Sequence, residues 1–199
     1  MIDHVFPADQ KQLNMVMTQL KSLGRLTDDL HFLSLASAGQ LTLQMGVLNL
    51  ESVLNERLAW LKPQLEAAGM SVSLEAEGEF YYVGDESRLG QVFNIIIENM
   101  LRYCARGDCM QICMSRSERG IELTFQDFGP GVAEDYLPHI FERFTRGERS
   151  RARDSGGSGL GLSIAKEICV AHHGRITASQ PPEKGLLIAI NFPIMDSDG

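Results

Sequence analysis

The sequence holds few of the features that mark zinc-binding, secreted or membrane-spanning proteins. It has only four cysteines, Cys104, Cys109, Cys113 and Cys169, and their spacing matches no zinc site. We expect them to be reduced thiols in a cytoplasmic compartment. No apolar run approaches the roughly 20 residues that a membrane-spanning helix needs, and the N-terminus lacks the pattern of a signal peptide. The sequence therefore predicts no membrane segment in this chain.

Basic residues are scarce as well. The chain has 18 Lys and Arg residues against 26 Asp and Glu residues, which gives a formal net charge of −8. An acidic surface disfavours nucleic acid and anionic membranes as partners. Internal repeats and low-complexity tracts are also absent from the sequence. At 199 residues, the chain has room for one substantial domain with a hydrophobic core, plus an appendage.

The N-terminal part has the pattern of one long helix. Apolar residues with heptad-like spacing predict a helix over about residues 9–37, ended by Gly39. The seam consists of Leu13, Val16, Leu20, Leu23 and Leu30. Further apolar side chains at Met17, Leu26 and Leu33 widen it into the broad stripe of a bundle helix. So wide a stripe needs a partner, and we expect this helix to associate with another.

The remaining sequence alternates strand and helix patterns, which predicts an α+β fold with helices on one face of a mixed sheet. Strands are expected at 41–45, 71–77, 80–83, 110–116, 121–126, 175–179 and 186–192. Helices are expected at 50–68, 86–103, 134–144 and 160–172, the first two capped by Asn49 and Asp85. We expect hairpins between the second and third strands and between the fourth and fifth.

The segment QVFNIIIENMLRY, residues 91–103, carries the first candidate site. Its apolar face comprises Val92, Ile95, Ile96 and Met100. Asn99 lies toward the same face, where an unpaired carboxamide is costly. Two interpretations stay open: Asn99 caps a neighbouring loop, or it offers an oxygen to a metal ion that bridges the phosphates of a nucleotide. Arg102 and Tyr103 add a cation and a hydroxyl near the same end.

Two glycine-containing segments are candidate contacts for that nucleotide. Asp127-Phe-Gly-Pro-Gly131 follows a predicted strand, so its carboxylate can accept from the exocyclic amine of adenine; a turn with an Asx cap is the alternative. Gly156–Gly161 precedes a helix whose free N–H groups can hold phosphate, or it is a loop without a ligand. Because this second segment follows a polar loop and has no Lys-Ser/Thr pair, Rossmann and P-loop sites are excluded.

An aromatic and basic segment lies between these two. Phe141 and Phe144, three residues apart, are expected to pin it onto the core. Arginines follow at Arg146, Arg149, Arg151 and Arg153. The alternatives are a solvated basic loop, a nucleic-acid contact and an arginine-bearing lid over polyphosphate. The lid explains the clustering best, because no aromatic stacking platform for bases accompanies the arginines.

The chain presents these elements in the order Asn99, Asp127-x-Gly-x-Gly, Phe-x-x-Phe and Gly-Ser-Gly-Leu-Gly. This order closely resembles the N, G1, F and G2 boxes of the ATP-binding catalytic domain of sensor histidine kinases, in the GHKL superfamily of gyrase, Hsp90, histidine kinase and MutL. The resemblance covers about residues 9–193 and looks closest to the envelope-stress kinases of bacteria. It implies a Bergerat fold, a two-layer α/β sandwich that binds ATP and Mg²⁺ beneath a mobile lid at about residues 132–158.

The resemblance implies a role for each matching position. Asn99 would ligate Mg²⁺, and Asp127 would accept from the adenine amine. Gly129 and Gly131 would let the backbone approach the base. Glu98 is a carboxylate near the expected metal and a candidate catalytic base.

Other matching positions would contact the phosphates. Arg102 and Tyr103 match a pair that approaches the phosphates and the base. Arg146 matches an arginine that reaches the γ-phosphate, where it would be catalytic. The lid and its hinge would add nucleotide contacts from Arg143, Gly157, Ser158, Gly159, Leu160 and Gly161.

Two features depart from the family. The N box usually has an Asn four residues before the metal ligand, where this chain has Ile95; Asn94 lies about 100° round the helix and cannot replace it. The phosphoacceptor box of the dimerisation hairpin, which begins with a histidine and an acidic residue, is missing. We interpret the five histidines as structural or incidental: His4, His31, His139, His172 and His173.

We therefore expect a fragment that begins between the two helices of the dimerisation hairpin. Residues 1–40 would hold the second hairpin helix, and residues 41–199 the ATP-binding catalytic domain. The leading hypothesis is a histidine protein kinase that transfers the ATP γ-phosphoryl group to a histidine absent from this chain, and thence to the receiver domain of a response regulator. The fragment itself is not expected to autophosphorylate. The intact protein would be a homodimer through the hairpin, with this part on the cytoplasmic side of the inner membrane.

Two alternatives remain open. A nucleotide-binding regulatory module without kinase turnover is favoured by Ile95 and by the missing histidine box. Another ATPase of the superfamily is disfavoured, because gyrase-like and chaperone-like members lack the F box and the N-terminal heptad helix.

Overall fold

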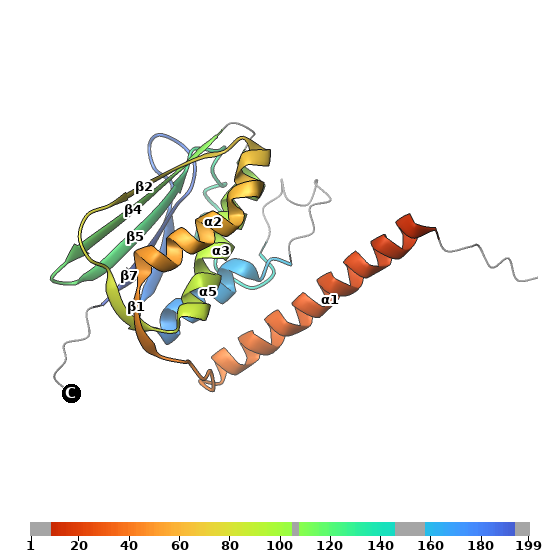
Figure 1. Cartoon of the computed structure of the whole chain (residues 1–199), viewed down its shortest axis with the longest axis horizontal. Helices are drawn as coiled ribbons and strands as arrows, with labels where there is room; N and C mark the ends of the chain where they lie inside the picture. Colours follow the sequence, from red (N-terminus) through yellow and green to blue (C-terminus); the bar gives the residue numbers. More distant parts are fainter. Residues whose placement is uncertain (1–8, 105–107, 146–157, 194–199) are drawn as a thin grey trace, which may run out of the picture. The chain divides into compact units, whose positions relative to one another are not determined.

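The computed structural model describes residues 9–104, 108–145 and 158–193 (Figure 1). The chain divides into two compact units, Met1–Gln40 and Leu41–Gly199, hereafter the N-terminal and the C-terminal unit. Within the described ranges, every helix is too short or too polar to serve as a membrane span.

One long helix, α1 (Gln10–Ser37), makes up the described part of the N-terminal unit and confirms the element predicted for residues 9–37. Gly39 follows it with a φ of 66°, the left-handed conformation with which glycine commonly ends a helix. The predicted seam is exposed along α1, at Leu13, Val16, Leu20, Leu23 and Leu30. An apolar stripe therefore faces solvent over most of this helix.

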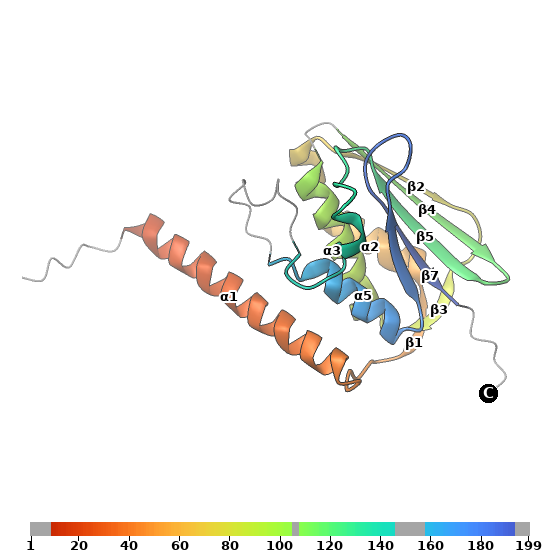
Figure 2. The ribbon, with the colours of Figure 1, turned by 180° about the vertical axis from the view of Figure 1, so that it is seen from behind.

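The C-terminal unit is a two-layer α+β sandwich on a five-stranded sheet, in the order β2-β4-β5-β7-β6. The strands are β2 (Ser71–Ala76), β4 (Cys109–Ser117), β5 (Gly120–Asp127), β6 (Arg175–Ser179) and β7 (Leu187–Phe192). β2 and β4 are parallel and the other neighbours antiparallel, so the sheet is mixed. One face is covered by the helices α2 (Leu50–Ala68), α3 (Glu86–Tyr103) and α5 (Gly161–Ala171) (Figures 1 and 2). The predicted fold class is confirmed.

The alternation of side chains along the strands places the core between this sheet and its helices. The sheet contributes fully buried residues at Met110, Ile112, Leu123, Phe125, Ile188 and Ile190. The helix α3 contributes Val92, Phe93, Ile96, Ile97 and Met100 from the opposite side. The rings of Phe93 and Phe125 pack with their centroids 6.0 Å apart. Each such side chain contributes about 1.5–3 kcal/mol by its burial, so this layer holds α3 firmly in place.

Side-chain caps position α2 and α3, as predicted. Asn49 Oδ1 accepts from the N–H groups of Glu51 and Ser52, at 2.9 and 3.3 Å. Asp85 Oδ1 accepts from the N–H of Arg88 at 3.0 Å. These bonds satisfy amides that the first helical turn leaves free, and each cap is worth about 1 kcal/mol.

The pairing predicted for the first strands is wrong. The strand expected at 41–45 lies instead at Gly46–Asn49 (β1), and it pairs antiparallel with β3 (Tyr81–Gly84) in a sheet of two strands. β3 therefore forms no hairpin with β2, whose partner is β4. Alternation of polar and apolar residues identifies a strand but carries little information about its partner. The backbone of Gln44 bonds a side chain instead of a strand, since its N–H donates to Asp85 Oδ2 at 2.8 Å.

The later elements follow the prediction with one exception. β4 and β5 form the predicted hairpin, and α5, β6 and β7 lie within a residue or two of their predicted ranges. The helix expected at 134–144 is wrong, because this segment contains only a 3₁₀ turn, η1 (Leu137–His139). Pro138 has no N–H for a longer helical ladder, and Phe144 has a φ of 62°, which lies outside the right-handed helical region.

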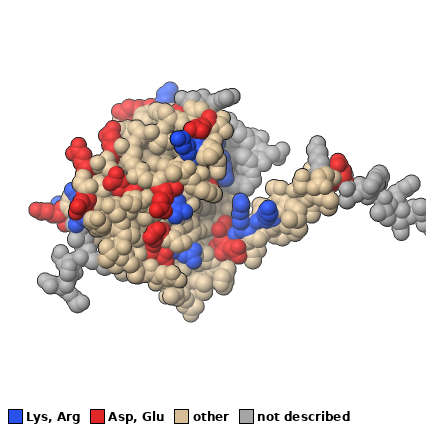
Figure 3. All heavy atoms as spheres, viewed as in Figure 1, with Lys and Arg blue, Asp and Glu red and all other residues tan. Residues whose placement is uncertain are grey.

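The outer face of the sheet is polar. Glu75, Glu122 and Asn191 are exposed on β2, β5 and β7. Figure 3 shows the C-terminal unit from the side of α2, where acidic (red) and basic (blue) side chains stand close to one another.

Candidate nucleotide-binding site

The helix α3 contacts both glycine-containing segments. At its end, Cys104 lies against Asp127 and Gly129, because a Cβ atom at Gly129 would lie 3.3 Å from Cys104 Sγ. More than two turns earlier, Ile95 lies against the start of α5, because a Cβ atom at Gly161 would lie 3.3 Å from Ile95 Cγ2. The predicted N, G1 and G2 boxes therefore border one region along the C-terminal half of α3.

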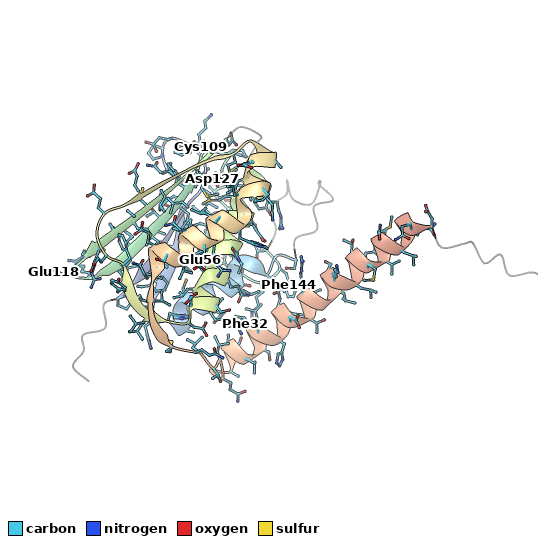
Figure 4. The ribbon with its side chains drawn as sticks, in the orientation of Figure 1. Phe32, Glu56, Cys109, Glu118, Asp127 and Phe144 are labelled. Carbon is cyan, nitrogen blue, oxygen red and sulfur yellow. The ribbon has the colours of Figure 1, made fainter. Side chains whose placement is uncertain are left out.

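Asp127 is the last residue of β5 and is almost fully buried, with 4% of its surface exposed (Figure 4). Its Oδ1 accepts from the N–H of Gly129 at 3.0 Å and from the N–H of Leu186 at 3.2 Å. Neither of these bonds uses Oδ2. Because a carboxylate has about four acceptor positions, capacity remains for a ligand amine such as that of adenine.

The ionisation of Asp127 reflects opposing influences. Burial raises the pKa of its carboxyl above the ordinary value, because the charged form loses contact with water. The hydrogen bonds from Gly129, Leu186 and Cys104 lower the pKa, and the charge of Asp108 raises it further. A buried carboxylate needs such donors, and these also fix its orientation.

Three glycines allow the backbone to crowd around this carboxylate. A Cβ atom at Gly129 would lie 3.2 Å from Asp127 Oδ1. Gly131 has a φ of 70°, and a Cβ atom there would lie 2.5 Å from Gln180 Nε2. Gly185 has a φ of 92°, and a Cβ atom there would collide with the carbonyl oxygen of Asp127. Only glycine fits the position of Gly185, which combines a left-handed φ with so close a backbone neighbour.

The sequence predicts Gly129 and Gly131 but misses Gly185 and Leu186. These two residues precede β7, and Leu186 is 59 positions from Asp127 along the chain. The Pro-Pro-Glu-Lys-Gly sequence there indicates a turn, but its composition carries no information about what the turn contacts.

Asn99 and Glu98 are neighbours on α3 that differ in exposure, since Asn99 is half-buried and Glu98 is exposed. Asn99 lies about one turn after Ile95, so it belongs to the face of α3 that contacts the start of α5. This position suits a ligand of a phosphate-bound metal. The roles of Asn99 in metal binding and of Glu98 in catalysis stay predictions.

The donor set around Asn99 does not form a resident metal centre. Among the described residues, no group of three or more His, Cys, Asp or Glu side chains could hold a metal ion. Mg²⁺ often binds through one or two protein ligands, with waters and substrate phosphates completing its shell. The residues present therefore fit a magnesium ion that arrives together with a nucleotide.

The start of α5 is suited to an anion. Its N-cap residue is Leu160, whose side chain has no hydrogen-bond acceptor. The first N–H groups of the helix therefore lack a side-chain cap, and the helix dipole favours negative charge beside them. Ser158 Oγ accepts from the N–H of Leu160 at 3.3 Å, and Gly159 has a φ of 73°. This turn is where the sequence predicts contacts to phosphate.

The F segment contacts the G2 segment through its backbone. The N–H of Phe144 donates to the carbonyl oxygen of Gly159 at 3.0 Å. Phe144 itself is 59% exposed, so the expectation that its ring pins the segment onto the core is wrong (Figure 4). Its left-handed backbone serves the turn into this contact, and the buried Ile140 anchors the segment instead. Phe141 is half-buried.

The remaining predicted residues divide into two groups. Arg102 is exposed and Tyr103 half-buried in the last turn of α3, and Arg143 is exposed in the F segment. Arg146 and Gly157 lie outside the described residues, together with the middle of the predicted lid. Their contacts with a nucleotide stay predictions.

Comparison with known proteins agrees with these features. The family model described as histidine kinase-, DNA gyrase B- and HSP90-like ATPase matches residues 84–196, more than half of the 199 residues. The chain is 37% identical over 179 residues to the signal transduction histidine-protein kinase BaeS of Escherichia coli K12. This alignment covers 90% of the chain and 38% of BaeS, so the chain spans well under half of that relative.

Solved structures share the fold. The histidine kinase AdeS of Acinetobacter baumannii superposes with a TM-score of 0.81 at 26% identity, covering 98% of this chain and 89% of that chain. Full-length ShkA, solved in complex with AMPPNP, superposes with a TM-score of 0.77 at 20% identity, covering 96% of this chain and 40% of that chain. The extent of the family match shows that the chain belongs to the histidine kinase-, DNA gyrase B- and HSP90-like ATPases.

Proposed function

We propose that this chain is the ATP-binding catalytic part of a two-component sensor histidine kinase. It would transfer the γ-phosphoryl group of ATP to a histidine absent from this chain, from which the phosphate passes to an aspartate of a response-regulator receiver domain. One observation carries the proposal: α3 borders both a buried, oriented carboxylate at Asp127 and the start of α5 at Gly161.

Adenine is proposed to lie against Asp127. The carboxylate would accept from the exocyclic amine of adenine, whereas guanine presents a carbonyl oxygen at the same place and is repelled. Gly129 and Gly131 leave the backbone free to approach the base. The N–H groups of Gly129 and Leu186 already hold the carboxylate, so little side-chain entropy is lost when the base binds.

The phosphates are proposed to extend along α3 toward the start of α5, whose N–H groups would bind phosphate oxygens. A magnesium ion held by Asn99 would supply charge neutralisation on the phosphates when bound. Arg102 and Tyr103 would add contacts from the last turn of α3. Among the catalytic candidates, Glu98 is exposed on α3, and Arg146 belongs to the part of the lid outside the described residues.

In the transfer, the bond between the γ-phosphorus and the bridging oxygen of ADP breaks, and a bond to an imidazole nitrogen forms. There is little covalent chemistry for the protein in such a step, so its contribution is to position the groups and stabilise charge. The acceptor histidine would have to be presented by another segment or another chain.

The partners follow from the same proposal. The exposed apolar stripe of α1 supports a homodimer through a helical hairpin in the intact protein, because such a stripe is stabilised when a second helix covers it. The similarity to BaeS supports a response-regulator receiver domain as the second partner and a cytoplasmic position for this part.

Calorimetric titration with AMPPNP, with and without Mg²⁺, tests the nucleotide site. The wild type should bind in a magnesium-dependent manner. Asp127→Asn should lose roughly tenfold or more in affinity, because it removes a charged acceptor. Glu122→Gln is the matched control, since Glu122 is an exposed carboxylate on the same strand. A wild type that fails to bind at millimolar ligand would refute the proposed site.

A nucleotide-binding regulatory module without kinase turnover is the second candidate. Ile95 favours it, because an apolar side chain packs against Gly161 at a position where the family usually has an asparagine. A separate helical hairpin that carries the phosphoacceptor box can be supplied with labelled ATP to discriminate the two functions. Phosphorylation of the hairpin supports the kinase, whereas nucleotide binding without transfer supports the regulatory module.

A further inference from the structure

A thiol lies beside the proposed adenine-binding carboxylate. Cys104 follows α3 as its C-cap, and its N–H donates to the carbonyl oxygen of Met100 at 2.9 Å, which fixes the backbone here. The side chain is half-buried and lies beside the Asp127 carboxylate. A Cβ atom at Gly129 would lie within 3.3 Å of both Cys104 Sγ and Asp127 Oδ1, so the three residues form one tight cluster.

The thiol acts as a donor in this cluster. Burial, followed by the negative charges of Asp127 and Asp108, raises the pKa of the Cys104 thiol to about 12. The sulfur therefore keeps its proton at neutral pH, and it is a poor nucleophile. An ionised carboxylate can only accept hydrogen bonds, so the S–H group donates to Asp127.

We propose that Cys104 is a positioning residue of the adenine site, whose S–H group donates to the Asp127 carboxylate and holds it ionised and oriented for the base. The inference rests on the function proposed above. Gly129 and Leu186 also donate to Asp127, but through backbone N–H groups. Cys104 contributes a side-chain donor from a different element, so a substitution can remove it while the backbone donors stay.

The groups around Asp127 show why this donor matters. Burial and the charge of Asp108, which directly precedes β4, both favour the neutral carboxyl. The bonds from Gly129 in the G1 turn, from Leu186 before β7 and from Cys104 after α3 all favour the carboxylate. Without the thiol, the two backbone bonds from Gly129 and Leu186 would be left, among the described residues, to oppose burial and Asp108. The pKa of Asp127 must therefore rise when Cys104 is truncated.

Carbon-13 NMR of the Asp127 carboxyl group, in the full chain without nucleotide, measures this effect directly. The carboxyl signal of Asp127 is assigned by its absence from the spectrum of Asp127→Asn. Cys104→Ala should titrate at higher pH than the wild type, and Cys104→Ser should restore or exceed the wild-type behaviour, because a hydroxyl is a stronger donor than a thiol. Cys113→Ala is the matched control: Cys113 lies on the outer face of β4 next to Glu75, and its loss should leave the Asp127 titration unchanged.

Nucleotide binding provides the second readout. AMPPNP affinity at neutral pH should fall about threefold to tenfold in Cys104→Ala, the range expected for one lost hydrogen bond of ordinary strength, because the thiol is a weak donor. The loss of affinity on acidification should also begin at a higher pH in this variant, and Cys104→Ser should reverse both changes. Affinity that falls equally in both variants, with no change in the Asp127 titration, would show a packing role only and overturn the inference. A wild type that binds no nucleotide would refute the proposed function, while the carboxyl titration would still decide the role of Cys104.

Discussion

His172 Nε2 accepts a hydrogen bond from the backbone N–H of Asp85 at 2.9 Å, which links the end of α5 to the start of α3. On the other side of the ring, Nδ1 donates to the carbonyl oxygen of Ile168 at 2.8 Å. The hydroxyl of Tyr82 on β3 donates to the carbonyl oxygen of His172. These partners require a neutral ring with its proton on Nδ1, and the ring is fully buried. A single histidine therefore joins the two helices that border the proposed site.

The first prediction concerns pH. Burial lowers the pKa of His172 below its ordinary value, an effect that outweighs the opposing bond to Ile168 and charge of Asp85. The unfolded histidine, with a pKa of about 6.5, then binds protons more readily than the folded one. The stabilising contribution of the neutral His172 should therefore be fully present above the unfolded pKa. The free energy of unfolding should fall as the pH drops from there toward the lower pKa of the folded state.

Urea unfolding between pH 8 and pH 5 measures this dependence. His172→Gln keeps an acceptor for the N–H of Asp85 but does not titrate, so its stability should fall less steeply in this range. His173→Gln is the control, because His173 is exposed. Parallel pH profiles for the wild type and His172→Gln would contradict the assigned neutral state.

The second prediction concerns Asp85, which bonds two separate parts of the backbone. Its Oδ1 caps α3 through Arg88, and its Oδ2 accepts from the N–H of Gln44 at 2.8 Å. Asp85→Ala should lower the free energy of unfolding by about 1–3 kcal/mol, because it leaves both donors without this acceptor. Glu86→Ala, at the exposed first position of the same helix, should cost less than about 1 kcal/mol. Denaturant titration at neutral pH compares the two, and equal losses would argue against the cap.

The stability that Asp85 contributes should also depend on pH in the acid range. Burial raises the pKa of this carboxyl, but the bonds from Gln44 and Arg88 and the charge of Arg88 bring it below the ordinary value. Its stabilising contribution is therefore present above the unfolded pKa of about 3.8–3.9 and is lost as the pH falls through the lower, folded value. The difference in the free energy of unfolding between the wild type and Asp85→Ala should therefore become smaller below about pH 4.

The third prediction concerns Gly185. An alanine there would place its Cβ against the carbonyl oxygen of Asp127 and would have to adopt a φ of 92°. We expect Gly185→Ala to lower the free energy of unfolding by more than about 2 kcal/mol and to weaken AMPPNP binding. Gly46→Ala is the matched control, since no atom lies within 4 Å of its Cβ position, and it should change stability by less than about 1 kcal/mol. Thermal unfolding of both variants gives the comparison, and a wild-type Tm for Gly185→Ala would be the contrary result.

The fourth prediction concerns the apolar stripe of α1. Leu20 and Leu23 are about 60% exposed, and we expect the chain to associate through this surface. The double variant Leu20→Ala and Leu23→Ala should shift the population toward the monomer in light scattering, because it removes the apolar area that a partner helix would bury. Substitution of the exposed polar residues Gln19 and Ser22 by alanine is the control. An oligomer that the leucine variant leaves unchanged would exclude this surface.

Much of the proposed site could be anticipated because its signals are local. Asn49 and Asp85 cap helices through bonds to residues two or three positions away, so their roles follow from the sequence around them. The turn from Asp127 to Gly129 closes within three residues and is equally local. Periodicity alone placed α1, α3, α5 and the hairpin of β4 and β5, since each depends on its own pattern of apolar residues.

Other features were decided only by the tertiary structure, because they depend on contacts between segments that are far apart in the chain. The partner of β2 is β4 and that of β3 is β1, because pairing is settled by which edges the whole fold brings together and not by the alternation within a strand. The exposure of Phe144 follows from a backbone contact with Gly159, across 15 residues. The sequence by itself determined the order of the boxes and the helices that carry them. The close packing of Cys104, Gly185 and Leu186 around Asp127 arose only when the folded core fixed the end of α3 and the start of β7 beside β5.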